Sequence, residues 1–219
     1  KKTKMIFVEN PGSNTFDFQD LYQIIKLAKK NNIITALDNT WGTPLFLKPL
    51  EIGFDMSISS ATKYFSGHSD VMVGSLAVNK KVFSKVNFYN LVSGYRASPD
   101  DAYLVIRGLR TLDIRLEKHQ INTRKVIQFL KKQKKIKEIL YPHKKGSKNY
   151  KNWKKYYSGA TGLLSLVIKS KSKASVYKFI NSLELFGIGY SWGGFESLAV
   201  YQDLQREHPK YEDKNLHIV

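Results

Sequence analysis

Two short apolar runs on either side of an amphipathic segment constrain the fold of this chain more than any other feature. Residues 5–8 (Met-Ile-Phe-Val) are followed by a loop that contains Pro and Gly, which is typical of a buried strand. Residues 33–37 form a continuous, β-branched run, as expected for a strand covered on both faces. Between them, apolar residues recur at the helical spacing i, i+3, i+4 and i+7: Leu21, Ile24, Ile25 and Ala28. Strand, helix and strand in this order predict an α/β fold with a mostly parallel sheet.

Residues 55–58 and 73–78 are two further expected strands. After the first hundred residues the pattern changes from alternating strands and helices to a long helical segment. Ser98 begins a helix well, because it can cap the first turn and is followed by Pro and two acidic residues. The periodic pattern then continues to about Leu130 and predicts one long helix that links two parts of the molecule. A strand at residues 162–168 and a second amphipathic helix predict that the later part is α+β. Apolar residues give that helix its spacing: Val176, Phe179, Ile180 and Leu183.

The charge of the chain raises the question of a polyanion partner. The chain has 36 Lys and Arg against 18 Asp and Glu, which gives a formal net charge of +18. A polyanion-binding protein that uses a Lys-rich helix around residues 131–145 is therefore one candidate function. The basic residues are mostly Lys rather than the Arg of sequence-reading proteins, and they are scattered along the chain. A solvated, lysine-rich surface is the simpler interpretation, and we expect no nucleic-acid partner.

Several classes of site and location are disfavoured by what the sequence lacks. There is no Cys, which excludes disulfides, thiolate metal sites and a cysteine nucleophile and fits a reducing compartment. No apolar run approaches the roughly 20 residues that span a bilayer. No two of the five His have ligand spacing. We therefore expect a cytoplasmic protein with no membrane contact and no metal site.

Chemistry-bearing residues follow two of the expected strands. Asp38 stands directly after the apolar run at residues 33–37, where ligands bind in open α/β sheets, although it could also cap a following turn. Ser60, Thr62 and Lys63 come after the next strand. A single Lys is usually a surface residue, but an amine, two hydroxyls and a carboxylate at neighbouring strand ends form a much rarer combination. Together they match the aldehyde, the phosphate and the pyridine nitrogen of pyridoxal 5'-phosphate (PLP).

These residues resemble the Cys/Met-metabolism family of PLP-dependent enzymes. The resemblance is carried by four segments: Glu9-Asn10-Pro11-Gly12-Ser13, Asp38-Asn39-Thr40-Trp41, Ser60-Ala61-Thr62-Lys63-Tyr64 with Gly67-His68-Ser69-Asp70, and Arg107-Gly108-Leu109-Arg110-Thr111-Leu112. It implies the aspartate-aminotransferase-like fold of PLP enzymes. Residues 1–110 would be part of the PLP-binding large α/β domain. Residues 111–219 would be a linking helix and a small C-terminal α+β domain.

The resemblance also implies roles for individual residues. Lys63 would form the Schiff base with the cofactor and move protons, and Asp38 would bind the pyridine nitrogen. Ser60 and Thr62 would bind the cofactor phosphate. Ser191 would lie near the lysine and the substrate carboxylate. Tyr190 and Trp192 would shape the substrate pocket, so that the three residues Tyr190, Ser191 and Trp192 form the expected substrate-binding set.

The segment at residues 190–198 looks like that of the cystathionine β-lyase branch of the family. The implied reaction is α,β-elimination of L-cystathionine to homocysteine, pyruvate and ammonia, as in methionine biosynthesis. A γ-synthase or γ-lyase of the same family is the alternative. The family further implies a homotetramer built as a dimer of dimers.

Two departures from the family pattern affect these expectations. The upstream segments that carry other cofactor contacts in the family have no counterpart here, so the chain is interpreted as a fragment that lacks the N-terminal part. Near the end, Asn215 stands where the family has an Arg that pairs with the substrate carboxylate. Arg206 is one residue that could compensate.

Overall fold

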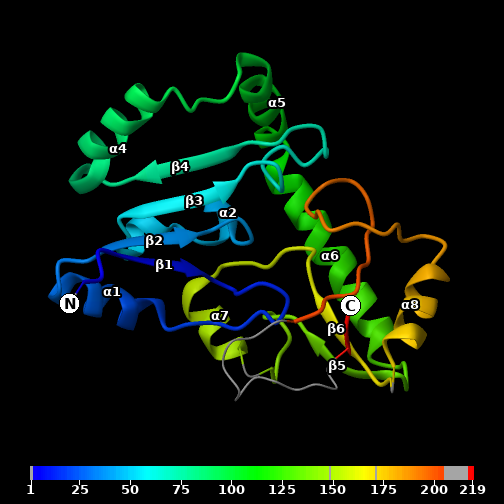
Figure 1. Cartoon of the computed structure of the whole chain (residues 1–219). Helices are drawn as coiled ribbons and strands as arrows, with labels where there is room; N and C mark the ends of the chain where they lie inside the picture. Colours follow the sequence, from blue (N-terminus) through cyan, green and yellow to red (C-terminus); the bar gives the residue numbers. More distant parts are fainter. Residues whose placement is uncertain (1, 148, 171, 205–216) are drawn as a thin grey trace.

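The computed structural model describes residues 2–147, 149–170, 172–204 and 217–219. Its first sheet contains β1 (Met5–Glu9), β2 (Ile34–Asp38), β3 (Met56–Ser60) and β4 (Gly74–Val78), in that spatial order (Figure 1). β1, β2 and β3 are parallel, and β4 pairs with β3 in the antiparallel sense. The predicted α/β fold with a mostly parallel sheet is confirmed.

The helices around this sheet are partly those expected. α1 (Leu21–Lys30) connects β1 and β2, and the Asp20 side chain caps it by accepting a hydrogen bond from the Gln23 amide. The buried face of α1 comes from the predicted periodic positions: Leu21, Ile25 and Ala28. Two one-turn helices, α2 (Thr43–Phe46) and α3 (Pro49–Ile52), connect β2 and β3. After β4 the chain forms α4 (Lys80–Ser93), which the sequence patterns did not predict.

The predicted single helix from Ser98 to Leu130 is wrong, because the structure divides it into α5 (Pro99–Leu109) and α6 (Leu112–Leu130). At the break, the Gly108 carbonyl accepts hydrogen bonds from the Thr111 amide at 3.1 Å and from the Thr111 hydroxyl at 3.2 Å. An uninterrupted helix would instead pair that carbonyl with the amide four residues on. The start of the helix is as predicted, since the Ser98 hydroxyl accepts a hydrogen bond from the Asp101 amide.

A second, antiparallel sheet forms from the later part of the chain, with the order β5 (Ile136–Leu140), β6 (Ser165–Ile168) and β7 (His217–Ile218). α7 (Tyr150–Tyr156) precedes β6, and α8 (Lys173–Asn181) follows it. The Lys-rich segment predicted as helical is therefore a turn followed by strand β5, and this removes the helix on which the polyanion-binding alternative relied.

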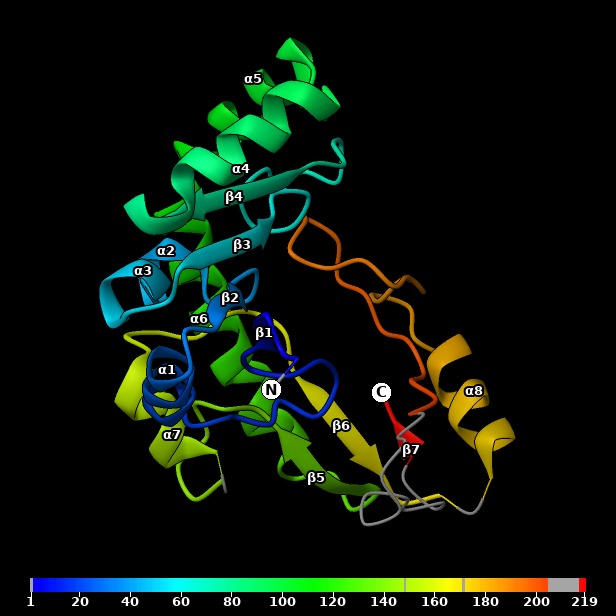
Figure 2. The same cartoon turned by 60° about the vertical axis from the view of Figure 1, so that its left-hand side comes forward.

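One hydrophobic cluster joins the two sheets. It contains Val8 and Leu37 from the first sheet, Ile139 and Leu166 from the second, and Ile127 from α6. α6 runs from the first sheet towards the second (Figures 1 and 2). The predicted domain boundary near residue 110 falls at the α5–α6 break, and the division into two domains stays a prediction. Within the described residues, no helix is long and apolar enough to cross a membrane.

Candidate active site

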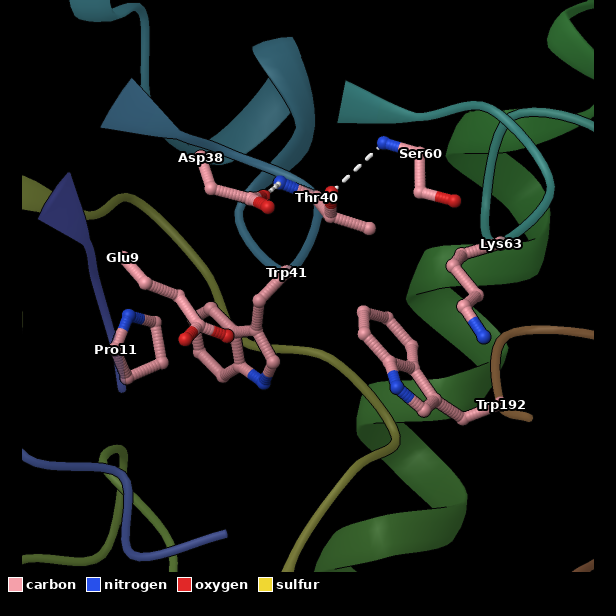
Figure 3. A pocket seen from close by; sticks show the side chains of 8 residues that line it. All are labelled: Glu9, Pro11, Asp38, Thr40, Trp41, Ser60, Lys63 and Trp192. Carbon is pink, nitrogen blue, oxygen red and sulfur yellow. Dashed lines mark hydrogen bonds between the residues drawn. The ribbon is translucent and has the colours of Figure 1, made fainter. Parts of the chain in front are cut away.

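The carboxyl ends of the three parallel strands carry polar side chains to one edge of the first sheet. Glu9 ends β1, Asp38 ends β2 and Ser60 ends β3. The strand register pairs Glu9 directly with Asp38. A pocket of about 170 Å³ lies at this edge (Figure 3). Eight residues line it: Glu9, Pro11, Asp38, Thr40, Trp41, Ser60, Lys63 and Trp192.

Thr40 fixes the ends of β2 and β3 relative to each other. Its amide donates to Oδ1 of Asp38 at 2.8 Å, and its hydroxyl oxygen accepts from the Ser60 amide at 2.8 Å (Figure 3). Among the described residues, Oδ2 of Asp38 has no hydrogen-bond partner. Asp38 does not cap α2, whose N-cap is Gly42. The carboxylate is thus held by one oxygen while the side chain faces the pocket.

Lys63 reaches the pocket from the turn that follows β3. Its Nζ donates a hydrogen bond to Oγ of Ser191 at 2.9 Å and lies 5.2 Å from the ring centroid of Trp192. Figure 3 shows the amine beside the Trp192 indole. Burial lowers the pKa of the Lys63 ammonium below its ordinary value of 10.5, because a partly dehydrated site disfavours the charged form. The amine is therefore easier to deprotonate than that of an exposed lysine.

Tyr64 supports the turn that carries Lys63. It is 2% exposed and its ring lies 5.3 Å from that of Trp192 and 5.5 Å from that of His119. Burial raises the pKa of the Tyr64 phenol to about 12, so this side chain stays neutral at physiological pH. Tyr64 is thus a packing residue behind the pocket.

Three residues of the predicted site lie outside the pocket lining: Thr62, Tyr190 and Ser191, the last of which accepts the hydrogen bond from Lys63. The Thr62 hydroxyl accepts a hydrogen bond from the Val73 amide at 3.0 Å and donates to the Val73 carbonyl, so it ties the lysine turn to the chain before β4. Tyr190 is 77% exposed. The phosphate-binding role of Thr62 and the substrate-binding role of Tyr190 stay predictions. Asn215 and Arg206 lie outside the described residues.

The pocket also contains residues to which the sequence analysis gave no role. These residues are Glu9, Pro11, Thr40 and Trp41. They belong to the segments that carry the family resemblance, but no role was predicted for them individually. Trp41 is 5% exposed, and its Nε1 has no hydrogen-bond partner among the described residues. The signal that could have identified Glu9 is its position directly after the first apolar strand, which is the position that Asp38 holds after the second.

The donor set of the pocket fits PLP. An amine, a carboxylate and a hydroxyl come from Lys63, Asp38 and Ser60, and these groups suit the aldehyde, the pyridine nitrogen and the phosphate of that cofactor. The unpartnered indole N–H of Trp41 is one more polar group available to a ligand. Among the described residues, no cluster of His, Asp and Glu could hold a metal ion.

Comparisons with known proteins agree with this chemistry. The family model described as Cys/Met metabolism PLP-dependent enzyme matches residues 1–217. A putative cystathionine beta-lyase from Rhizobium johnstonii is 39% identical over 203 residues, which cover 91% of this chain and 51% of that protein. An L-alanine/L-glutamate racemase from Wolbachia pipientis wMel is 38% identical over 90% of this chain and 49% of its own length.

The fold is shared with solved structures. The crystal structure of cystathionine gamma synthase from Xanthomonas oryzae pv. oryzae, in complex with aminoacrylate and cysteine, superposes with a TM-score of 0.85 at 32% identity. The match covers 89% of this chain and 50% of that one. The chain therefore spans about half the length of the relatives it matches.

Proposed function

The chain belongs to the Cys/Met metabolism PLP-dependent enzymes. On this premise we propose that it serves a carbon–sulfur lyase that splits L-cystathionine by α,β-elimination into homocysteine and aminoacrylate, which water hydrolyses to pyruvate and ammonia. One observation carries the proposal: the Lys63 amine lies 2.9 Å from the Ser191 hydroxyl and 5.2 Å from the Trp192 ring, at the pocket that also holds Asp38. The Ser-Trp pair is the feature by which the sequence resembles the β-lyase branch. Curated relatives named cystathionine beta-lyase support the same choice.

PLP, when bound, withdraws electrons from the substrate Cα, which makes the Cα proton removable and the Cβ–sulfur bond breakable. In this proposal Lys63 holds the cofactor and then takes the Cα proton on Nζ. Because burial lowers the pKa of Lys63, a larger fraction of the amine is neutral and able to accept that proton. The same amine, once protonated, is the group within reach to return a proton to the departing sulfur.

The neighbours of Lys63 orient this chemistry. The Ser191 hydroxyl fixes the direction of the amine through its hydrogen bond. The Trp192 ring stabilises the ammonium form, since a cation over an indole face within about 6 Å is attracted to it. Asp38, oriented by the Thr40 amide, would hold the pyridine nitrogen in its protonated, electron-withdrawing form, and Ser60 would donate to the phosphate.

The whole enzyme would include more chain than these residues. The pocket volume of about 170 Å³ is below the roughly 300–1,000 Å³ of typical ligand sites. The solved relatives have about as much chain again. We propose that the active protein is an oligomer of the family's tetrameric kind in the cytoplasm, with an amino-acid substrate and no nucleic-acid partner.

A γ-synthase or γ-lyase activity is the second candidate. The observation that favours it is the close structural match to the cystathionine gamma synthase of Xanthomonas oryzae pv. oryzae and to a cystathionine gamma-lyase of Lactobacillus plantarum complexed with L-serine, which has a TM-score of 0.84. Both candidates would use the same lysine. A γ-lyase would break the Cγ–sulfur bond of cystathionine instead of the Cβ–sulfur bond, whereas a γ-synthase would form the Cγ–sulfur bond.

Identifying the products separates these activities. L-Cystathionine is incubated with PLP and the 219-residue chain, and also with any longer polypeptide of which it is part. Pyruvate as the keto acid indicates β-elimination, and 2-oxobutyrate indicates γ-elimination. With alanine or glutamate as substrate, loss of Cα stereochemistry without a keto acid would indicate racemisation, as the name of the Wolbachia relative suggests. The Lys63→Ala variant should form no pyruvate above the rate of free PLP; normal release by that variant would disprove the role of Lys63.

A further inference from the structure

The residues that meet the Lys63 amine belong to a segment with almost no buried side chains. Residues 187–199, which we call the specificity segment, follow α8 by a few residues and contain no helix. The ends of the segment meet, because the Gly187 amide donates to the Ser197 carbonyl and the Ala199 amide donates to the Gly187 carbonyl, both at 2.9 Å. No residue of the segment is fully buried, and Ile188, Tyr190 and Phe195 are largely exposed. Within the segment only Trp192, which is partly buried, packs against the hydrophobic clusters. A segment with so little core packing needs specific contacts to hold one position.

Those contacts come from the turn that carries Lys63. We call residues 61–70 the lysine loop. Figure 2 shows the specificity segment, in orange, reaching the loop that follows β3. At one end of the contact, Ser191 and Trp192 meet Lys63 and Tyr64. At the other end, the Ser69 hydroxyl donates a hydrogen bond to Oε2 of Glu196 at 2.7 Å.

Two glycines allow the segment and the loop to approach this closely. A Cβ on Gly193 would lie 3.0 Å from the backbone of Lys63 and Tyr64, and its φ of +84° is in the region that favours glycine. A Cβ on Gly194 would lie 2.1 Å from Oγ of Ser69 and 2.7 Å from Oε2 of Glu196. The space beside the Ser69–Glu196 bond is therefore open only to a residue without a side chain.

We propose that Glu196 is a positioning residue, whose hydrogen bond with Ser69 fastens the specificity segment to the lysine loop and so presents Ser191 and Trp192 to the Lys63 amine. A carboxylate acceptor makes this bond stronger than a bond between neutral groups. Glu196 is not among the residues that line the pocket, and its hydrogen bond is to Ser69 rather than to Lys63. The effect of Glu196 on catalysis rests on the proposed function, whereas its role in holding the specificity segment on the lysine loop does not.

Hydrogen exchange of the cofactor-free chain, followed by mass spectrometry of peptides from residues 187–199, tests the fastening without an activity assay. Glu196→Ala should make these amides exchange roughly ten to a hundred times faster, as expected when a hydrogen bond to a charged group is lost. Glu196→Gln should stay within about threefold of the wild type, because its amide oxygen can still accept from Ser69. Glu184→Ala, an acid removed just before the segment, is the matched control and should exchange like the wild type.

A second variant removes the same bond from the other side. Ser69→Ala should reproduce the faster exchange of Glu196→Ala, and the double variant should add little, because both changes break one interaction. In the loaded enzyme, Glu196→Ala should lower kcat while Glu196→Gln restores most of it. Exchange in Glu196→Ala at the wild-type rate, or in Glu196→Gln as fast as in Glu196→Ala, would overturn the proposal. If the exchange results hold and no lyase activity is found, only the proposed function fails.

Discussion

A methyl group added at Gly108 tests how tightly the lysine loop is packed. Gly108 lies in α5, and a Cβ there would be 2.3 Å from the carbonyl oxygens of Phe65 and Ser66 and 2.7 Å from Cα of Ser66. Real Cβ contacts are not shorter than 3.0 Å, so α5 and the loop would have to separate by at least about 0.7 Å. Such overpacking costs roughly 1–3 kcal/mol, and the upper end applies because the obstructing atoms are backbone.

The better helix propensity of alanine offsets about 1 kcal/mol of that cost. The free energy of unfolding of Gly108→Ala should therefore fall by about 2 kcal/mol. Urea unfolding followed by circular dichroism measures the change, and Gly74→Ala is the control, since a Cβ on Gly74 meets nothing within 4 Å. That variant should be as stable as the wild type or slightly more stable. If Gly108→Ala also unfolds at the wild-type urea concentration or above it, the proposed packing of α5 against the lysine loop is wrong.

Two further predictions concern the core and the effect of pH. Leu21→Ala should lower the free energy of unfolding by roughly 2–5 kcal/mol, because Leu21 is fully buried. Leu27→Ala on the same helix, where the side chain is 57% exposed, should change it by less than about 0.5 kcal/mol. Equal losses of stability in urea unfolding of the two variants would contradict the packing of α1. Burial alone would raise the pKa of Asp55, but hydrogen bonds from Thr35 and Asn79 outweigh it and hold the pKa below 3.8. A lowered pKa stabilises the fold above 3.8 and loses that effect as the pH falls through the lowered value. Asp55→Asn should therefore be less stable than the wild type at pH near 7, and the difference in free energy of unfolding should shrink below about pH 4. A difference that does not change with pH would disprove the stabilising role of the ionised Asp55.

Parts of the fold could be predicted because they depend on local patterns. The apolar run that became β2 is buried through its centre, and Asp38 lies where such a strand must end. The run that became β1 was also found, but the prediction that it is buried is wrong, because only Val8 is buried and Phe7 is 58% exposed. The turn with Lys63 was found because an amine and hydroxyls stand together in the sequence.

Other parts depend on contacts that a sequence pattern does not show. The break between α5 and α6 follows from hydrogen bonds to the Gly108 carbonyl, one of which comes from the side chain of Arg115, seven residues further along the chain. Strand β5 was hidden because Lys137 and Glu138 interrupt its alternation. The position of Glu9 after the first apolar run is visible in the sequence, but its place directly beside Asp38 follows from the register of β1 on β2.

The central claim is that Lys63 is the amine that holds the cofactor. The direct measurement is to add PLP, reduce with borohydride and locate the attached phosphopyridoxyl group by peptide mass spectrometry. The pKa of Lys63 is lowered by burial, and its amine faces the pocket that holds Asp38, so the group should be found on Lys63 in preference to the many other lysines, and this attachment should disappear in Lys63→Arg. Attachment spread evenly over surface lysines, with the same yield in Lys63→Arg, would contradict the claim.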